Sequence, residues 1–177
     1  MSGAGAPGAR GLGTGPTHGA SIAEQVPGEA TIPGRRGVRP GLRLAVVVTR
    51  WNEGVVTALL EGALRAARDS GVRDVRVEAV EGALELPLAA SLLTRSSDAV
   101  VALGAVIEGE TPHFEHVCRA SVDGLMRVSL DANTPIGNGV LTCFSIEQAW
   151  ARAGVPGSTE DKGYEATIAA IDLASLA

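Results

Sequence analysis

The sequence has few aromatic residues, few cysteines and no excess of positive charge. Aromatics make up 3% of its 177 residues, and only two cysteines occur, Cys118 and Cys143. Two cysteines in a long chain without a signal-peptide pattern argue against a disulfide scaffold and favour a reducing cytoplasm. Fifteen basic and twenty acidic residues give a net charge of −5, which disfavours a nucleic-acid partner. No apolar run approaches the roughly 20 residues of a membrane span.

The first 40 residues differ in composition from the rest of the chain. Residues 1–40 hold ten of the 23 glycines and five of the nine prolines. They show no periodic apolar pattern that could bury a face against a core, so we predict a disordered tail. Within it, residues 21–26 form a short stretch that pairing with a sheet edge, in this chain or a neighbour, could order. We expect one folded domain over residues 41–177.

From Leu42 onward, short apolar runs alternate with amphipathic stretches, a pattern typical of βαβ units. The runs predict strands at residues 44–48, 75–80, 99–107 and 135–142. Helices are expected around 56–67, 86–94, 114–125, 145–153 and 161–176. We therefore predict an α/β fold, a three-layer αβα sandwich of flavodoxin-like type with a four-stranded parallel sheet.

Two of the predicted helices carry more specific expectations. Ser145 is expected to cap the helix that follows it, with Gln148 completing a capping box. The last helix is expected to pack through the small face formed by Ala166, Ala169, Ala170 and Leu173.

Ligands of open α/β sheets bind beyond the carboxyl ends of the strands, so the residues after each predicted strand are the candidates. After the third strand, the amides of Gly109, Glu110 and Thr111 precede a helix that Pro112 opens. Such amides can face an anion such as phosphate, with the helix dipole behind them. An ordinary helix N-cap explains the same residues equally well.

His113 follows on the first turn of that helix. It is either a group for proton transfer near neutral pH or a surface or capping histidine. His113 and His116 lie three residues apart, but the only other histidine is His18 in the predicted tail. We therefore predict no metal site. A thiol nucleophile is also disfavoured, because neither cysteine has a partner base.

Polar and aromatic residues after the first two strands complete the candidate set. Trp51 is either a packing residue or a stacking platform for a flat heteroaromatic ligand. Asn52 can both donate and accept hydrogen bonds. Glu85 is either an acceptor for hydroxyls or a carboxylate that favours a helix start. Near the C-terminus, Arg152 and Lys162 are binding cations or simply solvated charges.

Several segments occur together in the order and spacing of one known family. They are GAVI at 104–107, GETPHF at 109–114, GVLT at 139–142, EQA at 147–149, RWN at 50–52, LEGA at 60–63, GALELP at 82–87 and DKG at 161–163. Over about residues 42–176 the sequence resembles the 6,7-dimethyl-8-ribityllumazine synthases. The resemblance implies a transferase of riboflavin biosynthesis that needs no cofactor or metal. Such an enzyme condenses 5-amino-6-(D-ribitylamino)uracil with 3,4-dihydroxy-2-butanone 4-phosphate, giving the lumazine, phosphate and water.

The resemblance also implies roles for individual residues. Trp51 would stack on the pyrimidine ring, Asn52 and Glu85 would bind the ribityl chain, and His113 would move protons during catalysis. The remaining substrate-binding residues would be Ala83, Leu84, Val106 and Ile107 beside the ring, Gly109, Glu110 and Thr111 around the phosphate, Arg152 on the phosphate from an adjacent subunit, and Asn138 and Lys162 on the ribityl side.

Some positions depart from the family pattern. Glu108 stands where an arginine or lysine is common, Glu81 and Leu84 stand where a proline and an aromatic are frequent, and Asn138 replaces a frequent aromatic. These departures keep an alternative open, a divergent paralogue that binds lumazine or flavin or condenses a related amine and carbonyl. The resemblance further implies a homopentamer with active sites between subunits. The long, proline-containing segment 155–160 favours the pentameric actinobacterial type over a sixty-subunit shell.

Overall fold

The computed structural model describes residues 34, 35 and 37–176. Residue contacts divide the chain into two units, Met1–Gly34 and Arg35–Ala177, and the second contains all the secondary structure described below. The stretch 21–26 and most of the expected tail lie outside the described residues. No helix in the described part of the chain is long and apolar enough to cross a membrane.

Four strands form one parallel sheet in the order β2-β1-β3-β4. The strands are β1 (Arg43–Thr49), β2 (Asp74–Val80), β3 (Ala99–Ile107) and β4 (Ile136–Cys143). Each boundary lies within one residue of its predicted position. The central strands β1 and β3 are nearly continuous apolar runs that helices cover on both faces, whereas the edge strand β2 is largely exposed. The predicted α/β sandwich is confirmed.

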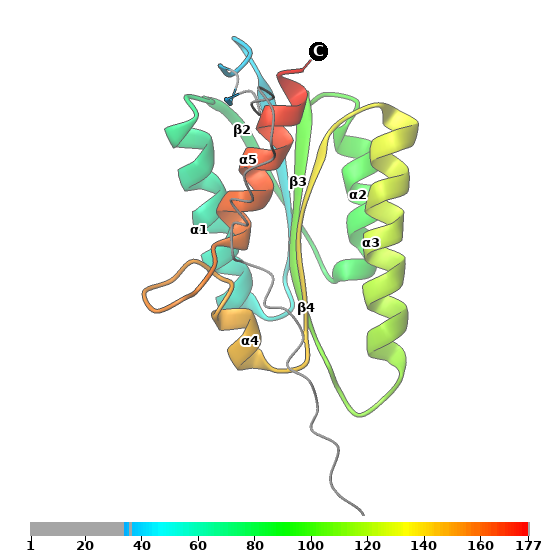
Figure 1. The fold of residues 1–177 in the computed structure, drawn as a ribbon. Helices are drawn as coiled ribbons and strands as arrows, with labels where there is room; N and C mark the ends of the chain where they lie inside the picture. The colour runs from blue at the N-terminus through cyan, green and yellow to red at the C-terminus, as the bar shows by residue number, and fades with distance from the viewer. Residues whose placement is uncertain (1–33, 36, 177) are drawn as a thin grey trace, which may run out of the picture. The chain divides into compact units, whose positions relative to one another are not determined.

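The helices cover the sheet in two layers, with α1 and α5 on one face and α2 and α3 on the other (Figure 1). They are α1 (Glu53–Asp69), α2 (Leu86–Leu93), α3 (His113–Ala132), α4 (Ile146–Trp150) and α5 (Lys162–Ala174). A short 3-10 helix, η1 (Ala83–Glu85), precedes α2 and was not predicted. Three residues are too few to show a helical period in a sequence.

Alternation along β1 divides the core between the two faces. Leu44 and Val46 pack with Leu59 and Ile171 on the side of α1 and α5. Ala45 and Val47 pack with the cluster of α2 and α3 on the opposite side. Burial of both faces leaves the ends of the strands as the places where polar groups can gather.

Helix α5 lies unusually close to its neighbours, and its packed face differs from the predicted one. A Cβ atom at Gly163 would lie 2.0 Å from the carbonyl oxygen of Leu59. Ala166 and Ala170 are buried as expected, but Ala169 is exposed and Leu173 is 51% exposed. The prediction was wrong for these two residues because backbone contact at Gly163, rather than the run of small side chains, sets the rotation of the helix.

Helix α4 is shorter than predicted and is capped differently. The Ser145 hydroxyl accepts from the Gln148 amide at 3.4 Å, as expected. The Gln148 side chain, however, accepts from the Phe144 amide at 3.0 Å rather than from that of Ser145, so only half of the predicted capping box forms. The helix ends at Trp150 because the chain turns through Gly154, which has φ 75°, into a bridge between Ala153 and Asp161.

Residues just before β1 contact the domain, although sequence patterns placed them in the tail. Val38 packs against the core, and the Arg39 amide donates to the Ser175 hydroxyl at 3.3 Å. The Arg39 guanidinium lies 2.7 Å from the carboxylate of Asp98. Hydrogen bonds from Arg43, with a smaller contribution from Arg39, hold the pKa of Asp98 well below its usual range.

We expect Gly163→Ala to lower the free energy of unfolding by about 2 kcal/mol, since the new methyl group must push α5 away from α1. The higher helix propensity of alanine offsets at most about 1 kcal/mol of this cost. Urea unfolding followed by circular dichroism measures the effect. Gly37→Ala is the matched control, because nothing lies within 4 Å of a Cβ atom there. Equal stabilities of the two variants would contradict the close packing.

Candidate active site

A cavity of about 400 Å³ lies at the carboxyl edge of the sheet. The loops after β1, β2 and β3 contribute to its wall, together with the first two turns of α3. The lining residues are Thr49, Trp51, Asn52, Glu81, Gly82, Ala83, Leu84, Glu85, Ala105, Val106, Ile107, Gly109, Thr111, His113, Phe114 and Val117. The fourth loop reaches the site only indirectly, through Phe144, whose ring centroid lies 6.1 Å from that of Phe114.

The loop between β1 and α1 places the indole of Trp51 and the side-chain amide of Asn52 at the cavity. The Trp51 side chain is 71% exposed, so it is not a core residue. Asn52 has φ 57°, a left-handed conformation that asparagine tolerates. Its Nδ2 atom donates to the carbonyl oxygen of Ala105 at 2.8 Å, which ties the loop to β3. The Asn52 Oδ1 atom accepts no hydrogen bond from the described residues and is available to a ligand.

The loop after β2 is hydrogen-bonded to the loop after β1, and it lines the same cavity through η1. The Glu85 carboxylate accepts from the Gly82 amide at 2.8 Å, which stabilises the short helix. Ala83 is buried, whereas Leu84 is about half exposed at the cavity. Glu81 forms an ion pair with Arg50, with Oε1 and Nε 3.2 Å apart. Glu85 therefore serves as a helix-start carboxylate and still lines the cavity.

Three consecutive free amides precede α3. The Glu108 amide donates to the Cys143 carbonyl at 2.9 Å and extends the pairing of β3 with β4. Within residues 34, 35 and 37–176, the amides of Gly109, Glu110 and Thr111 donate no hydrogen bond. Pro112 is the N-cap of α3 rather than its first residue, so this 20-residue helix begins at His113, one residue later than expected. Free amides before a helix N-terminus suit an anion.

Sequence reasoning assigned no role to Thr49, a polar residue at the cavity. Thr49 ends β1 and is 3% exposed. Its hydroxyl lies over Gly104, 3.2 Å from where a Cβ atom would be, and has no hydrogen-bond partner among the described residues. Its position as the last residue of an apolar run was the available signal, because that position lies at the edge where ligands bind.

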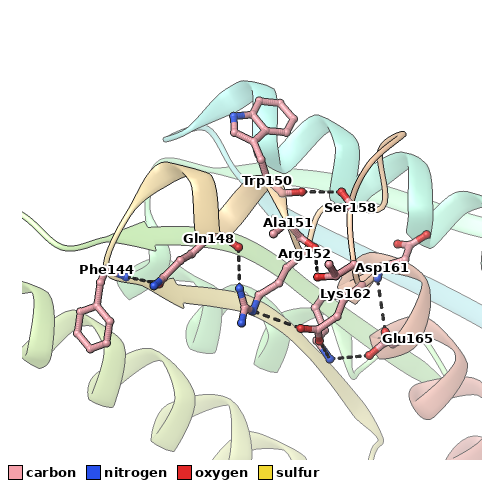
Figure 2. A network of polar contacts seen from close by, with 11 residues as sticks. Phe144, Gln148, Trp150, Ala151, Arg152, Ser158, Asp161, Lys162 and Glu165 are labelled. Atoms are coloured by element: carbon pink, nitrogen blue, oxygen red, sulfur yellow. Dashed lines mark hydrogen bonds and ion pairs between the residues drawn. The ribbon is translucent and has the colours of Figure 1, made fainter. Parts of the chain in front are cut away.

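Four predicted site residues do not line this cavity: Glu110, Asn138, Arg152 and Lys162. Asn138 is exposed on the edge strand β4, and its Oδ1 atom accepts from the Val140 amide at 3.0 Å. Arg152 follows α4 and Lys162 is the first residue of α5, and the two lie together in a network with Gln148 and Glu165 (Figure 2). No lysine or arginine is among the residues that line the cavity.

The cysteines and acidic residues offer little for thiol or metal chemistry. Cys143 is buried, and burial raises the pKa of its thiol, which disfavours a thiolate nucleophile. In the part of the chain that the structure describes, no three His, Cys, Asp or Glu side chains are grouped so that they could hold a metal ion.

The fold and the cavity together define a flavodoxin-like α/β protein with a small-molecule site at the carboxyl edge of its sheet. Comparison with known proteins narrows this class. The family model for 6,7-dimethyl-8-ribityllumazine synthase matches residues 41–177. The chain belongs to the 6,7-dimethyl-8-ribityllumazine synthase family and is a transferase of riboflavin biosynthesis.

Individual relatives agree with the family assignment. The 6,7-dimethyl-8-ribityllumazine synthase of Frankia casuarinae is 58% identical over 137 residues, covering 77% of this chain and 86% of that protein. The enzyme of the same name from Thermobifida fusca is 55% identical over 134 residues, covering 76% and 79%. That from Mycobacteroides abscessus is 54% identical over 138 residues, covering 78% and 86%.

Replacing Thr49 by the isosteric valine removes a buried hydroxyl that has no partner in the described part of the chain. We expect Thr49→Val to raise the free energy of unfolding by about 1 kcal/mol, since an unpaired buried hydroxyl costs stability. Urea unfolding of the ligand-free protein measures the change, and Thr49→Ser is the comparison that keeps the hydroxyl. A loss of stability in the valine variant would show that the hydroxyl is paired in solution.

Proposed function

We propose that this protein condenses 5-amino-6-(D-ribitylamino)uracil with 3,4-dihydroxy-2-butanone 4-phosphate to form 6,7-dimethyl-8-ribityllumazine. The observation that carries the residue assignment is the run of three free amides next to His113 and an exposed Trp51 that lines the same cavity. This arrangement offers an anion site, a proton-transfer group and an aromatic face together. Family membership supplies the identity of the two substrates.

The pyrimidine ring is assigned to the wall that Trp51 forms. An indole face suits a flat heterocycle, and the backbone of Ala83, Val106 and Ile107 offers amide and carbonyl groups to the ring edge. Leu84 adds apolar contact. The free Oδ1 atom of Asn52 and the carboxylate of Glu85 are the acceptors assigned to the ribityl hydroxyls.

The phosphate is assigned to the loop before α3. The amides of Gly109, Glu110 and Thr111 can donate to phosphate oxygens, and the dipole of α3 favours negative charge at that point. The carboxylates of Glu108 and Glu110 repel an anion, and no lysine or arginine lines the cavity of one chain. Additional positive charge is therefore needed to hold a phosphate dianion there.

Arg152 and Lys162 are the cations that we assign to this task, in a site completed by a second copy of the chain. Neither lines the cavity of its own chain, and both are partly exposed. With Asn138 on the exposed edge strand β4, they form a second set of polar groups that a neighbouring cavity can use. We propose a homopentamer in the cytoplasm, with each active site shared by two subunits.

His113 is assigned the proton transfers. The pyrimidine amine attacks the ketone and water leaves as the imine forms; phosphate is then eliminated, and ring closure releases a second water. The imidazole, on the first turn of α3 beside the free amides, is placed to move protons near the departing phosphate. Because an amine is already a competent nucleophile, holding the two substrates together supplies much of the rate acceleration.

Purified protein mixed with both substrates should produce the absorbance of the lumazine. Arg152→Ala should raise the KM for the phosphorylated ketone by about tenfold, since a charge-assisted contact to phosphate is lost. Steady-state kinetics with each substrate varied in turn measures the effect. Tight lumazine or flavin binding without turnover would support a carrier instead, and turnover of only a related amine and carbonyl would support a divergent paralogue.

His113→Asn should lower kcat by about tenfold, less than many general acid–base residues contribute, because the attacking amine needs no activation. The KM values should change little, because the side chain is assigned to proton transfer rather than to binding. His116→Asn, on the same helix but outside the cavity lining, is the matched control. An unaltered kcat in His113→Asn would remove the imidazole from the mechanism.

A further inference from the structure

Arg152 and Lys162 share one carboxylate that sequence reasoning did not single out. The Oε1 atom of Glu160 lies 3.6 Å from Nε of Arg152, and its Oε2 atom pairs with Nζ of Lys162. In Figure 2 the dashed lines from the Arg152 and Lys162 side chains converge between α4 and α5. One side chain thus joins two cations that are ten positions apart in the sequence.

The backbone around Glu160 is fixed to the segment that carries Arg152. The Glu160 amide donates to the Ala151 carbonyl at 3.1 Å, and the Glu160 carbonyl accepts from the Gly154 amide at 3.1 Å. The Lys162 amide donates to the Arg152 carbonyl at 3.0 Å. These hydrogen bonds hold the two arms of the loop together, so the carboxylate projects from a rigid frame.

The carboxylate is the least exposed of the three charged groups. The Glu160 side chain is 26% exposed, against 39% for Arg152 and 36% for Lys162. Arg152 uses Nε toward Glu160 and Nη1 toward the Gln148 carbonyl at 2.9 Å. Its Nη2 atom has no partner among the described residues, so donors remain available to a ligand.

Lys162 is held from two sides. Its ammonium pairs with Glu160 and lies 2.7 Å from a carboxylate oxygen of Glu165. Hydrogen bonds to these two carboxylates raise the pKa of Lys162 and keep it charged, and the contribution of Glu160 is the larger. Of the two cations Glu165 contacts only Lys162, and its other carboxylate oxygen accepts from the Asp161 amide at 3.4 Å. Glu160 contacts both cations, so replacing one carboxylate or the other tests different contacts.

We propose that Glu160 is a positioning residue that holds Arg152 and Lys162 at one separation, so that the pair meets the phosphate and the ribityl chain of substrates in a neighbouring cavity. This inference rests on the proposed function. The competing possibility is that Glu160 occupies the place of the phosphate and must be displaced by it. Its greater burial and its fixed backbone favour positioning, because a displaced group would have to leave a rigid frame.

The test is a comparison of KM values in three variants of the full chain. Glu160→Gln should raise the KM for both substrates by about fivefold, a size typical of losing a partly exposed ion pair, with kcat within about twofold of wild type. Glu165→Gln should raise only the KM for the ribitylaminouracil. Glu160→Asp keeps the charge on a shorter side chain and should restore part of both KM values.

Each other result overturns the inference. A lower KM for the phosphorylated ketone in Glu160→Gln would mean that the carboxylate competes with phosphate. Unchanged KM values would remove any role in binding. Higher KM values that Glu160→Asp leaves unrestored, together with a lower melting temperature, would assign Glu160 to folding alone. A wild-type chain that forms no lumazine would instead refute the proposed function, and this inference with it.

Discussion

All four strands run in one direction, and this constraint places every group that lines the cavity. Parallel pairing puts the carboxyl ends of β1, β2 and β3 at one edge, so loops separated by tens of residues meet there. Some backbone amides at that edge form hydrogen bonds of the sheet, and others are left free to bind a ligand. The amide of Glu108 continues the pairing with β4, while the next three amides do not. The anion-binding character of the loop arises where the sheet ends.

A second constraint, centred on Asp161, places the two cations at the junction of α4 and α5. The Asp161 carboxylate caps α5 by accepting from the Tyr164 amide at 3.0 Å and forms an ion pair with Arg65 of α1. A Cβ atom at Gly62 or Gly154 would lie 2.4 Å from this carboxylate, so both glycines make room for it. Because Asp161 lies between Glu160 and Lys162 in the chain, docking α5 on α1 also fixes those two side chains.

The sequence predicted the parts of the structure that depend on local patterns. Apolar runs marked β1 and β3, shorter apolar segments marked β2 and β4, and the position of loops after strands predicted Trp51 and His113. The rotation of α5 was mispredicted because the contact of Gly163 with Leu59 joins residues more than 100 positions apart. The free hydroxyl of Thr49 and the carboxylate shared by Glu160 depend on three-dimensional packing. No periodicity in the sequence carries that information.

Because the cations Arg152 and Lys162 lie outside the cavity, the charges that line the cavity of a single chain are negative. Glu81 and Glu85 line the cavity, Glu108 precedes its amide loop and Glu110 belongs to that loop. In a single copy, the amides and the dipole of α3 favour an anion, whereas these four carboxylates disfavour it. Arg152 and Lys162 are meanwhile balanced by Glu160 and Glu165, which lowers the cost of leaving two cations half-buried in an isolated chain. A site shared between copies would bring these two charge patterns together. Anion affinity would then depend on how firmly the second copy holds its cations, rather than on the cavity alone.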